Sequence, residues 1–165
     1  MRSSFILAGQ SYTLRHLRGF RVCVPAKEPL AKPAELQVTF SCHVYSEKWD
    51  PALHQMQNKF LEDGQERSFC PVRYGCSIKL EQIIRASLEG KVYWSRDGNG
   101  VLNSFIYGFA DSIPYPIYFS LGKAERINQA DGLMQIISAY QNPNLLARHR
   151  FQAVKFARLV HEKCK

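Results

Sequence analysis

The sequence predicts an α+β fold, with a mostly antiparallel sheet of five or six strands and two main helices. Two observations lead to this prediction. The second half of the chain reads, in order, as a helix, four strands joined by short turns, and a helix, and short turns place successive strands antiparallel. The chain has 165 residues, of which 45% are apolar, which is typical of one globular domain with its own core. We therefore expect a single domain over residues 1–165.

The first segment, residues 1–33, is basic and rich in proline. Short apolar stretches at 5–8 and 20–24 predict two short strands. The prolines that follow the second stretch predict an extended loop, because proline fixes φ and removes a backbone donor.

The next segment, residues 34–76, is expected to hold an edge strand and an irregular insertion. Apolar and polar residues alternate along 35–45, which predicts a strand with one apolar face. A short helix is predicted over 51–60, with Asp50 as its N-cap and proline at its first position.

The last segment, residues 77–165, is expected to form both main helices and a four-strand meander. Ser77 is predicted to cap a helix over 78–89, whose apolar residues fall on one face at helical spacing. After the last strand, a long basic helix is predicted over 145–163. The expected strands are 91–95, 101–110, 115–121 and 133–140, with turns at 97–100 and 113–116.

The net charge of +8 is unevenly distributed along the chain. Residues 1–33 carry +5, residues 34–122 carry −2, and residues 123–165 carry +5. Basic regions attract polyanions, because neutralising phosphates releases condensed counterions. If the two basic ends meet in space, they form one anion-binding face. If they lie apart, the charge is ordinary solubilising surface.

The N-terminus predicts a cytoplasmic protein without a membrane segment. No apolar run approaches the roughly 20 residues that span a bilayer, and the apolar stretch 5–8 is too short for a signal peptide. The five cysteines are then expected to be free thiols. Their spacing lacks the two tight pairs of a zinc ribbon, so we expect no metal and no cofactor.

Nucleotide-dependent enzymes, serine hydrolases and thiol-dependent enzymes find little support in the sequence. There is no phosphate-binding loop, dinucleotide fingerprint or nucleophile elbow. A thiol nucleophile at Cys42 would need His54 or His16 to reach it, because the adjacent His43 points to the other face of the expected strand.

Basic residues near the C-terminus are the strongest candidates for a functional site. Arginine forks bind phosphate, and a histidine beside them, His149, can transfer protons near neutral pH. Aromatic residues of the sheet can stack bases or pack in the core; they are Tyr93, Trp94, Tyr107, Tyr115 and Tyr118. The nucleic-acid-binding candidates are Arg148, Arg150, Lys155, Arg158, Arg15, Arg18 and Arg21.

The order of elements over about residues 77–160, together with Ile137-Ser138-Ala139, resembles the small ribonuclease toxins of the RelE and BrnT type. The BrnT branch has an arginine where this chain has Tyr140. The resemblance implies cleavage of RNA without a metal. It would make His149 the proton-transfer group, Arg148 and Arg150 the groups that stabilise charge, and Tyr140 a residue that positions a base. Tyr140, Arg148 and His149 are therefore the catalytic candidates.

The sequence thus predicts a small basic protein that binds nucleic acid, RNA rather than DNA. One alternative is a metal-independent ribonuclease of the toxin type. The other is a non-enzymatic interaction or regulatory module whose basic ends engage an acidic protein.

Overall fold

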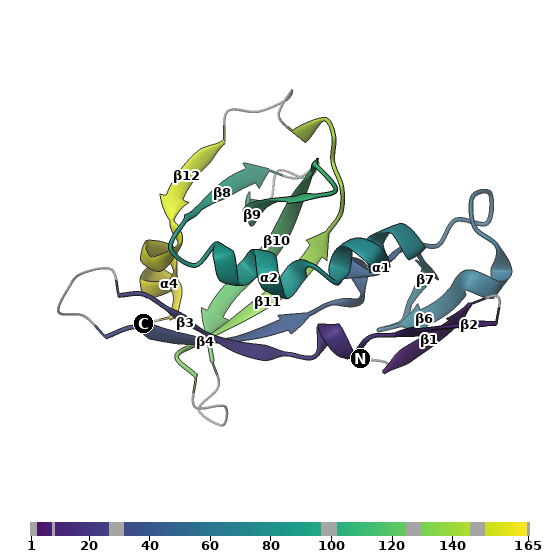
Figure 1. Cartoon of the computed structure of the whole chain (residues 1–165), viewed down its shortest axis with the longest axis horizontal. Helices are drawn as coiled ribbons and strands as arrows, with labels where there is room; N and C mark the ends of the chain where they lie inside the picture. The colour runs from purple at the N-terminus through teal and green to yellow at the C-terminus, as the bar shows by residue number, and fades with distance from the viewer. Residues whose placement is uncertain are drawn as a thin grey trace.

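The computed structural model describes residues 3–7, 9–26, 32–96, 102–124, 130–145 and 151–164. A curled seven-stranded sheet forms the main body, and a smaller β-rich lobe projects from one side (Figure 1). The strand order of the main sheet is β12-β8-β9-β10-β11-β4-β3. Its strands are β3 (Phe20–Val24), β4 (Ala34–Phe40), β8 (Lys91–Arg96), β9 (Leu102–Ala110), β10 (Ile113–Lys123), β11 (Gly132–Ala139) and β12 (Gln152–Lys155).

The α+β class and the mostly antiparallel sheet are confirmed, but the expected count of five or six strands is wrong. The sheet is mixed, because β4 pairs in parallel with β11, with Val38 opposite Met134. The strand expected at an edge lies inside the sheet, between β3 and β11. A parallel pair needs a long connection, and the chain between these strands carries the three-stranded sheet of the small lobe, two helices and strands β8 to β10.

The meander of β8 to β11 follows the predicted order, with one turn displaced. The turn expected at 113–116 lies at Asp111 and Ser112, whose φ angles are 53° and 66°. Two successive residues with positive φ suit the twist of a tight hairpin. The two prolines of 113–116 belong to β10. The expected turn at 97–100 lies outside the described residues.

A β-bulge interrupts the pairing of β10 with β11. Tyr118 lies opposite Ser138, whereas Phe119 lies opposite Ile136, so Ile137 is the extra residue. The Ser41 hydroxyl donates to the Ile137 carbonyl oxygen, and the Ser41 amide donates to that of Ile136. The bulge is thereby fixed to the end of β4.

The described residues contain three α-helices rather than the two main helices expected: α1 (Pro71–Ser77), α2 (Leu80–Ala86) and α4 (Phe156–Cys164). The helix expected over 78–89 corresponds to α2. Ser77 does not cap it, because its hydroxyl donates to the Tyr74 carbonyl at the end of α1. Pro71 begins α1, where its missing N–H has no intrahelical partner to lose.

The prediction of one long helix over 145–163 is wrong, because a strand interrupts this range. Residues 152–155 form β12, which pairs antiparallel with β8, and α4 follows directly from Phe156. Strand pairing at the edge of β8 prevails here over helix propensity, because the edge offers unpaired backbone groups. Phe156 and Val160 are fully buried, so α4 docks by one apolar stripe.

Helices α2 and α4 cover the same face of the sheet. A side chain at Gly108 of β9 would meet Ile83 of α2, and Phe156 of α4 packs against Phe119 of β10. Gly108 pairs with Tyr115, which shares a face with Phe119 because alternate residues of a strand point the same way. Figure 1 shows α2 lying across β10 and β11 on this side. No helix in the described ranges is long and apolar enough to cross a bilayer.

The smaller lobe joins the first hairpin to a three-stranded sheet. Phe5 stacks on Phe69 at 4.8 Å between ring centroids and meets Phe60 edge-on at 5.0 Å. The helix expected over 51–60 is wrong: a turn after Asp50 leads to a single 3-10 turn and then to a strand. The strands of the lobe are β1 (Ser4–Leu7), β2 (Gln10–Thr13), β5 (Ser46–Lys48), β6 (Lys59–Glu62) and β7 (Gln65–Phe69), and the 3-10 helices are η1 (Arg15–Leu17), η2 (Cys42–Val44) and η3 (Met56–Asn58).

Candidate nucleic-acid interface

The sheet face opposite α2 and α4 carries a continuous series of aromatic rings, called here the aromatic face. Its rings touch in sequence across the strands. Phe105 contacts Tyr93 at 5.6 Å, Phe151 at 5.0 Å and Tyr118 at 5.5 Å between centroids. Tyr118 stacks on Tyr140 at 6.0 Å. The aromatic face consists of Tyr93, Phe105, Tyr107, Tyr118, Tyr140 and Phe151.

The rings differ in exposure. Phe105 is fully buried beneath its neighbours, so it serves as the floor of the cluster. The other five are half-buried, so each presents part of its ring to solvent. An aromatic ring that is neither buried nor fully exposed offers a π surface at low entropic cost.

Two adjoining hollows open on this face beside Tyr118. The larger has a volume of about 380 Å³ and the smaller about 140 Å³. They share Ser95, Arg96 and Tyr118. The hollows therefore combine aromatic surface with hydroxyl, amide and guanidinium groups. The remaining lining residues are Asn103, Ile137, Ser138 and Tyr140 in the larger hollow, and Asn142, Asn144, Leu145 and Phe151 in the smaller.

The Tyr118 phenol is uncharged at neutral pH. Burial, followed by the neighbouring phenol of Tyr140, raises the pKa of Tyr118 to about 12. Tyr118 therefore adds no negative charge to repel a polyanion, and its hydroxyl stays a hydrogen-bond donor.

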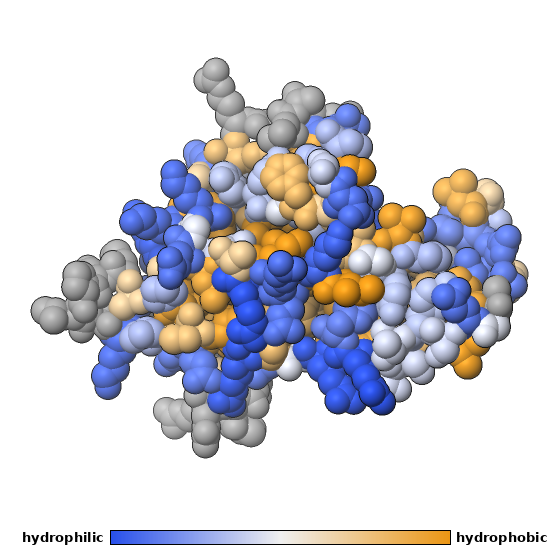
Figure 2. All heavy atoms as spheres, in the orientation of Figure 1, coloured by the Kyte–Doolittle hydropathy of each residue, from blue (hydrophilic) through white to orange (hydrophobic). Residues whose placement is uncertain are grey.

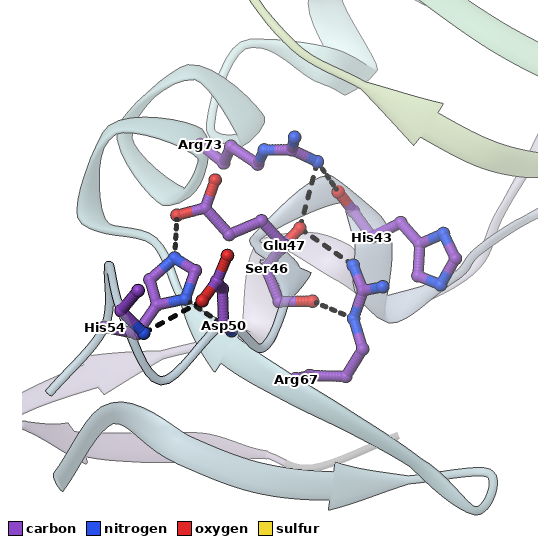
Figure 3. A network of polar contacts seen from close by, with 8 residues as sticks. His43, Ser46, Glu47, Asp50, His54, Arg67 and Arg73 are labelled. Carbon is purple, nitrogen blue, oxygen red and sulfur yellow. Dashed lines mark hydrogen bonds and ion pairs between the residues drawn. The ribbon is translucent and has the colours of Figure 1, made fainter. Parts of the chain in front are cut away.

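Arg73 of α1 extends the aromatic face toward the small lobe. Its guanidinium lies 5.2 Å from the centroid of the Tyr140 ring, within cation–π range. Its Nη1 donates to the carbonyl oxygens of His43 at 3.1 Å and Ser46 at 3.0 Å (Figure 3). Two backbone acceptors thus fix the position of this charge.

Below Arg73, a second arginine enters the same network from β7. Arg67 is 6% exposed, and it donates through Nε to the Ser46 hydroxyl and through Nη2 to the Ser46 carbonyl. Figure 3 shows both guanidinium groups converging on Ser46. His54 lies apart, between the Glu47 carboxylate at 3.1 Å and the Asp50 amide at 2.9 Å.

The cysteine alternative loses support at this point. Cys42 lies in the 3-10 turn η2 rather than on a strand, and burial raises the pKa of its thiol despite the opposing effect of Arg67. His54 is held by Glu47 and Asp50, and His16 lies 2.8 Å from the Ser77 hydroxyl. Both histidines thus have partners other than Cys42. The cysteines are free thiols, and no cluster within the described ranges has three or more His, Cys, Asp or Glu side chains able to hold a metal ion.

The sequence model of the YjaZ family matches residues 4–164, nearly the whole chain. The protein belongs to the YjaZ family. No curated protein and no solved structure shows significant similarity to it. The resemblance to ribonuclease toxins stays a prediction.

In this YjaZ-family chain, the predicted site residues fall into separate places. Tyr140 lies on the aromatic face. Arg15 and Arg18 are exposed beside a hollow of about 390 Å³ next to Thr39. Arg21 pairs with Glu35 at 2.9 Å.

Lys155 and Arg158 line another hollow, of about 630 Å³, together with Lys91. Pro25 and Ala26, which follow β3, line the same hollow, so the outermost strands of the curled sheet approach each other here. Arg15, Arg18 and Arg21 do not line it.

Arg148, His149 and Arg150 lie outside the described residues. Leu145 and Phe151, the nearest described residues on either side, both line the smaller hollow of the aromatic face.

Strand alternation decides which of the predicted stacking residues lie on this face. Tyr93, Tyr107 and Tyr118 lie on the aromatic face, whereas Trp94 and Tyr115 point to the opposite side. Tyr115 is fully buried, and burial raises the pKa of its phenol.

Sequence reasoning missed the residues that surround these rings. For Arg73 the available signal is Pro71, because proline at the first helical position marks a helix start. Ser95 could have been found by continuing the alternation from Tyr93. The contribution of Asn142 and Asn144 comes from a loop whose course no local pattern indicates.

Proposed function

We propose that the protein binds single-stranded RNA on the aromatic face. The observation that carries this proposal is the row of half-buried rings beside two hollows that also hold hydroxyl, amide and guanidinium groups. Bases of a single strand stack on aromatic side chains, with about 1–3 kcal/mol per base. Tyr118 and Tyr140 belong to the aromatic face and also line the larger hollow, so they are the proposed stacking residues.

The polar groups around these rings suit the rest of a nucleotide. The side-chain amides of Asn142 and Asn144 can donate to and accept from base edges. Arg96, which lines the hollows with Tyr118, and Arg73, which lies over the Tyr140 ring, supply positive charge for the phosphate backbone. A single strand is favoured over a duplex, because only unstacked bases can enter hollows of this size.

The proposal is limited to binding. Tyr118 keeps its proton at neutral pH, so it suits hydrogen bonding rather than the role of a general base. Cleavage of RNA, with His149 and Arg148 as candidates, is a further prediction that the same assay can test.

Fluorescence anisotropy with a labelled, unstructured RNA oligomer tests the binding proposal. We expect saturable binding that weakens steeply as salt rises. DNA of the same sequence and duplex RNA should bind more weakly. Electrophoresis of the RNA after incubation reports any cleavage.

Substitutions locate the interface. Tyr140→Ala should weaken binding by about tenfold or more, because a stacking partner is lost. Tyr140→Phe keeps the ring and should bind nearly as tightly as the wild type. Ile6→Ala, at a side chain of the small lobe that is 71% exposed, is the control. The proposal fails if RNA does not bind at low salt or if Tyr140→Ala binds like the wild type; in the former case an acidic protein partner becomes the better hypothesis.

A further inference from the structure

Two arginines meet at the junction between the small lobe and the aromatic face. Arg67 from β7 and Arg73 from α1 both donate to the carbonyl oxygen of Ser46, at 3.1 Å and 3.0 Å. Sharing one small acceptor holds two positive charges close together. Like charges at short range repel, and the repulsion is stronger away from water.

Carboxylates do not neutralise this pair within the described residues. Neither guanidinium is within ion-pair distance of an aspartate or glutamate there. Glu47 acts on Arg67 from further away, and its carboxylate contacts His54. Burial, and then the nearby Arg73 charge, lowers the pKa of Arg67. A buried charge without a counterion is unfavourable unless another group compensates it.

His43 completes the cluster on η2. Its ring is half-buried and has no hydrogen-bond partner among the described residues. Arg73 donates to the His43 carbonyl oxygen at 3.1 Å, which places His43 beside the arginine pair. Burial, followed by the charges of Arg67 and Arg73, lowers the pKa of the His43 ring. Asp63 acts in the opposite direction but more weakly. The His43 imidazole is therefore neutral at pH 7 and has an N–H to donate.

The geometry points to a binding site for a phosphate monoester between Arg67, Arg73 and His43. Among the described residues, Arg73 donates only through Nη1, and Arg67 leaves its Nη1 for another acceptor. Arginine forks match the geometry of phosphate oxygens. A phosphate monoester carries about −1.5 to −2 charges at pH 7, which offsets two guanidinium groups better than a single carboxylate does.

The position of Arg73 suggests where such a phosphate comes from. The same guanidinium lies over the Tyr140 ring, so a base stacked at Tyr140 would place its strand beside the cluster. We assign the site to the terminal phosphate of a bound RNA strand. This assignment of the source rests on the proposed function, whereas the anion chemistry of the cluster does not.

Inorganic phosphate is the first probe, added to the full chain at constant ionic strength. We expect phosphate, but not chloride, to raise the melting temperature saturably, because a ligand of the native state stabilises it. Phosphate should also raise the pKa of His43 in an NMR titration, because a nearby anion favours the charged ring. The inference is overturned if phosphate acts no differently from chloride.

Variants of the two arginines locate the effect. Arg73→Gln should weaken phosphate binding by about tenfold or more, since a charged fork is lost. Arg67→Lys keeps the charge of a buried side chain, so the variant should fold. It loses the fork, so it should bind phosphate more weakly. Arg85→Gln is the matched control, at an exposed arginine that pairs with Glu81 on α2. Equal binding by Arg73→Gln and the wild type would overturn the site.

RNA oligomers with either end phosphorylated or left as hydroxyl distinguish the two sources of phosphate. We expect one phosphorylated end to bind more tightly, and Arg73→Gln to abolish the preference. If RNA binds without any such preference while inorganic phosphate still binds, the site stands but the strand-end assignment is wrong. If phosphate binds and RNA does not, the proposed function fails and the site stands. If RNA binds and phosphate has no effect, the proposed function stands and the phosphate site is wrong.

Discussion

The two faces of the main sheet use aromatic and apolar side chains differently. On the face covered by α2 and α4, Ile106, Tyr115 and Ile117 are fully buried. On the aromatic face, Tyr93, Tyr118 and Tyr140 are only half-buried. Figure 2 shows that apolar and polar surface alternate over the visible side of the molecule, without one large apolar patch. The comparison indicates that one face stabilises the fold, and that the other retains ring surface for a ligand.

The largest effect is expected on the helix-covered face. Phe156→Ala removes a fully buried ring that packs against Phe119. We expect the free energy of unfolding to fall by about 3–5 kcal/mol, because the lost contacts leave a cavity. Urea denaturation measures the change. Tyr140→Ala, the matched change on the aromatic face, should destabilise far less, and a loss as large as that of Phe156→Ala would break the distinction between the faces.

A smaller effect on the same face is expected from Gly108→Val. A Cβ at Gly108 would lie 2.8 Å from Ile83 Cγ2 and 3.4 Å from the Tyr115 carbonyl oxygen. Pushing α2 away from the sheet should cost about 1–3 kcal/mol of the free energy of unfolding, as overpacking usually does. Thermal denaturation measures the change. Gly122→Ala is the control, because a Cβ at Gly122 would meet no atom within 4 Å and should change stability little by steric contact. An unchanged Gly108→Val variant would show that α2 does not pack tightly.

The smallest effect concerns alkaline pH and the aromatic face. The pKa of Tyr118 is raised from 10.0 to about 12, so the folded protein holds this proton more tightly than the unfolded chain. Its contribution to stability is therefore complete below about pH 10 and is lost as the pH rises toward 12. Denaturation at a series of alkaline pH values should show a smaller decline for Tyr118→Phe than for the wild type. Identical declines would mean that the Tyr118 environment does not favour the neutral phenol.

Local sequence pattern predicted the strands well. Alternation identified the strand at 35–45, whose first part is β4, and short apolar stretches between turn signals identified the strand at 20–24 and most of the meander. It could not show that β4 pairs with β11, because the paired residues are 96 positions apart and no local signal specifies such a partner. The same holds for 152–155, where the unpaired edge of β8 selects strand over helix.

The candidate site was predictable only in part. Tyr140 is a candidate through the resemblance to the ribonuclease toxins, and the structure shows that it contacts Tyr118 and Arg73. Arg73 reaches it from a helix about seventy residues earlier in the chain, and its position depends on carbonyl groups of the small lobe. Such an arrangement follows from tertiary structure, since no sequence spacing relates the three residues.

The β-bulge at Ile137 gives the protein a mechanical link between its two parts. By adding one residue to β11, it leaves Tyr118 and Ser138 paired beside the larger hollow while the strand beyond it returns to regular register. The carbonyl group freed by the extra residue is held by Ser41, at the point where the chain leaves β4 for the small lobe. This one bulge therefore couples the two parts of the molecule. The small lobe, whose carbonyl groups hold Arg73, cannot shift relative to the sheet without disturbing β11, the strand that positions Tyr140.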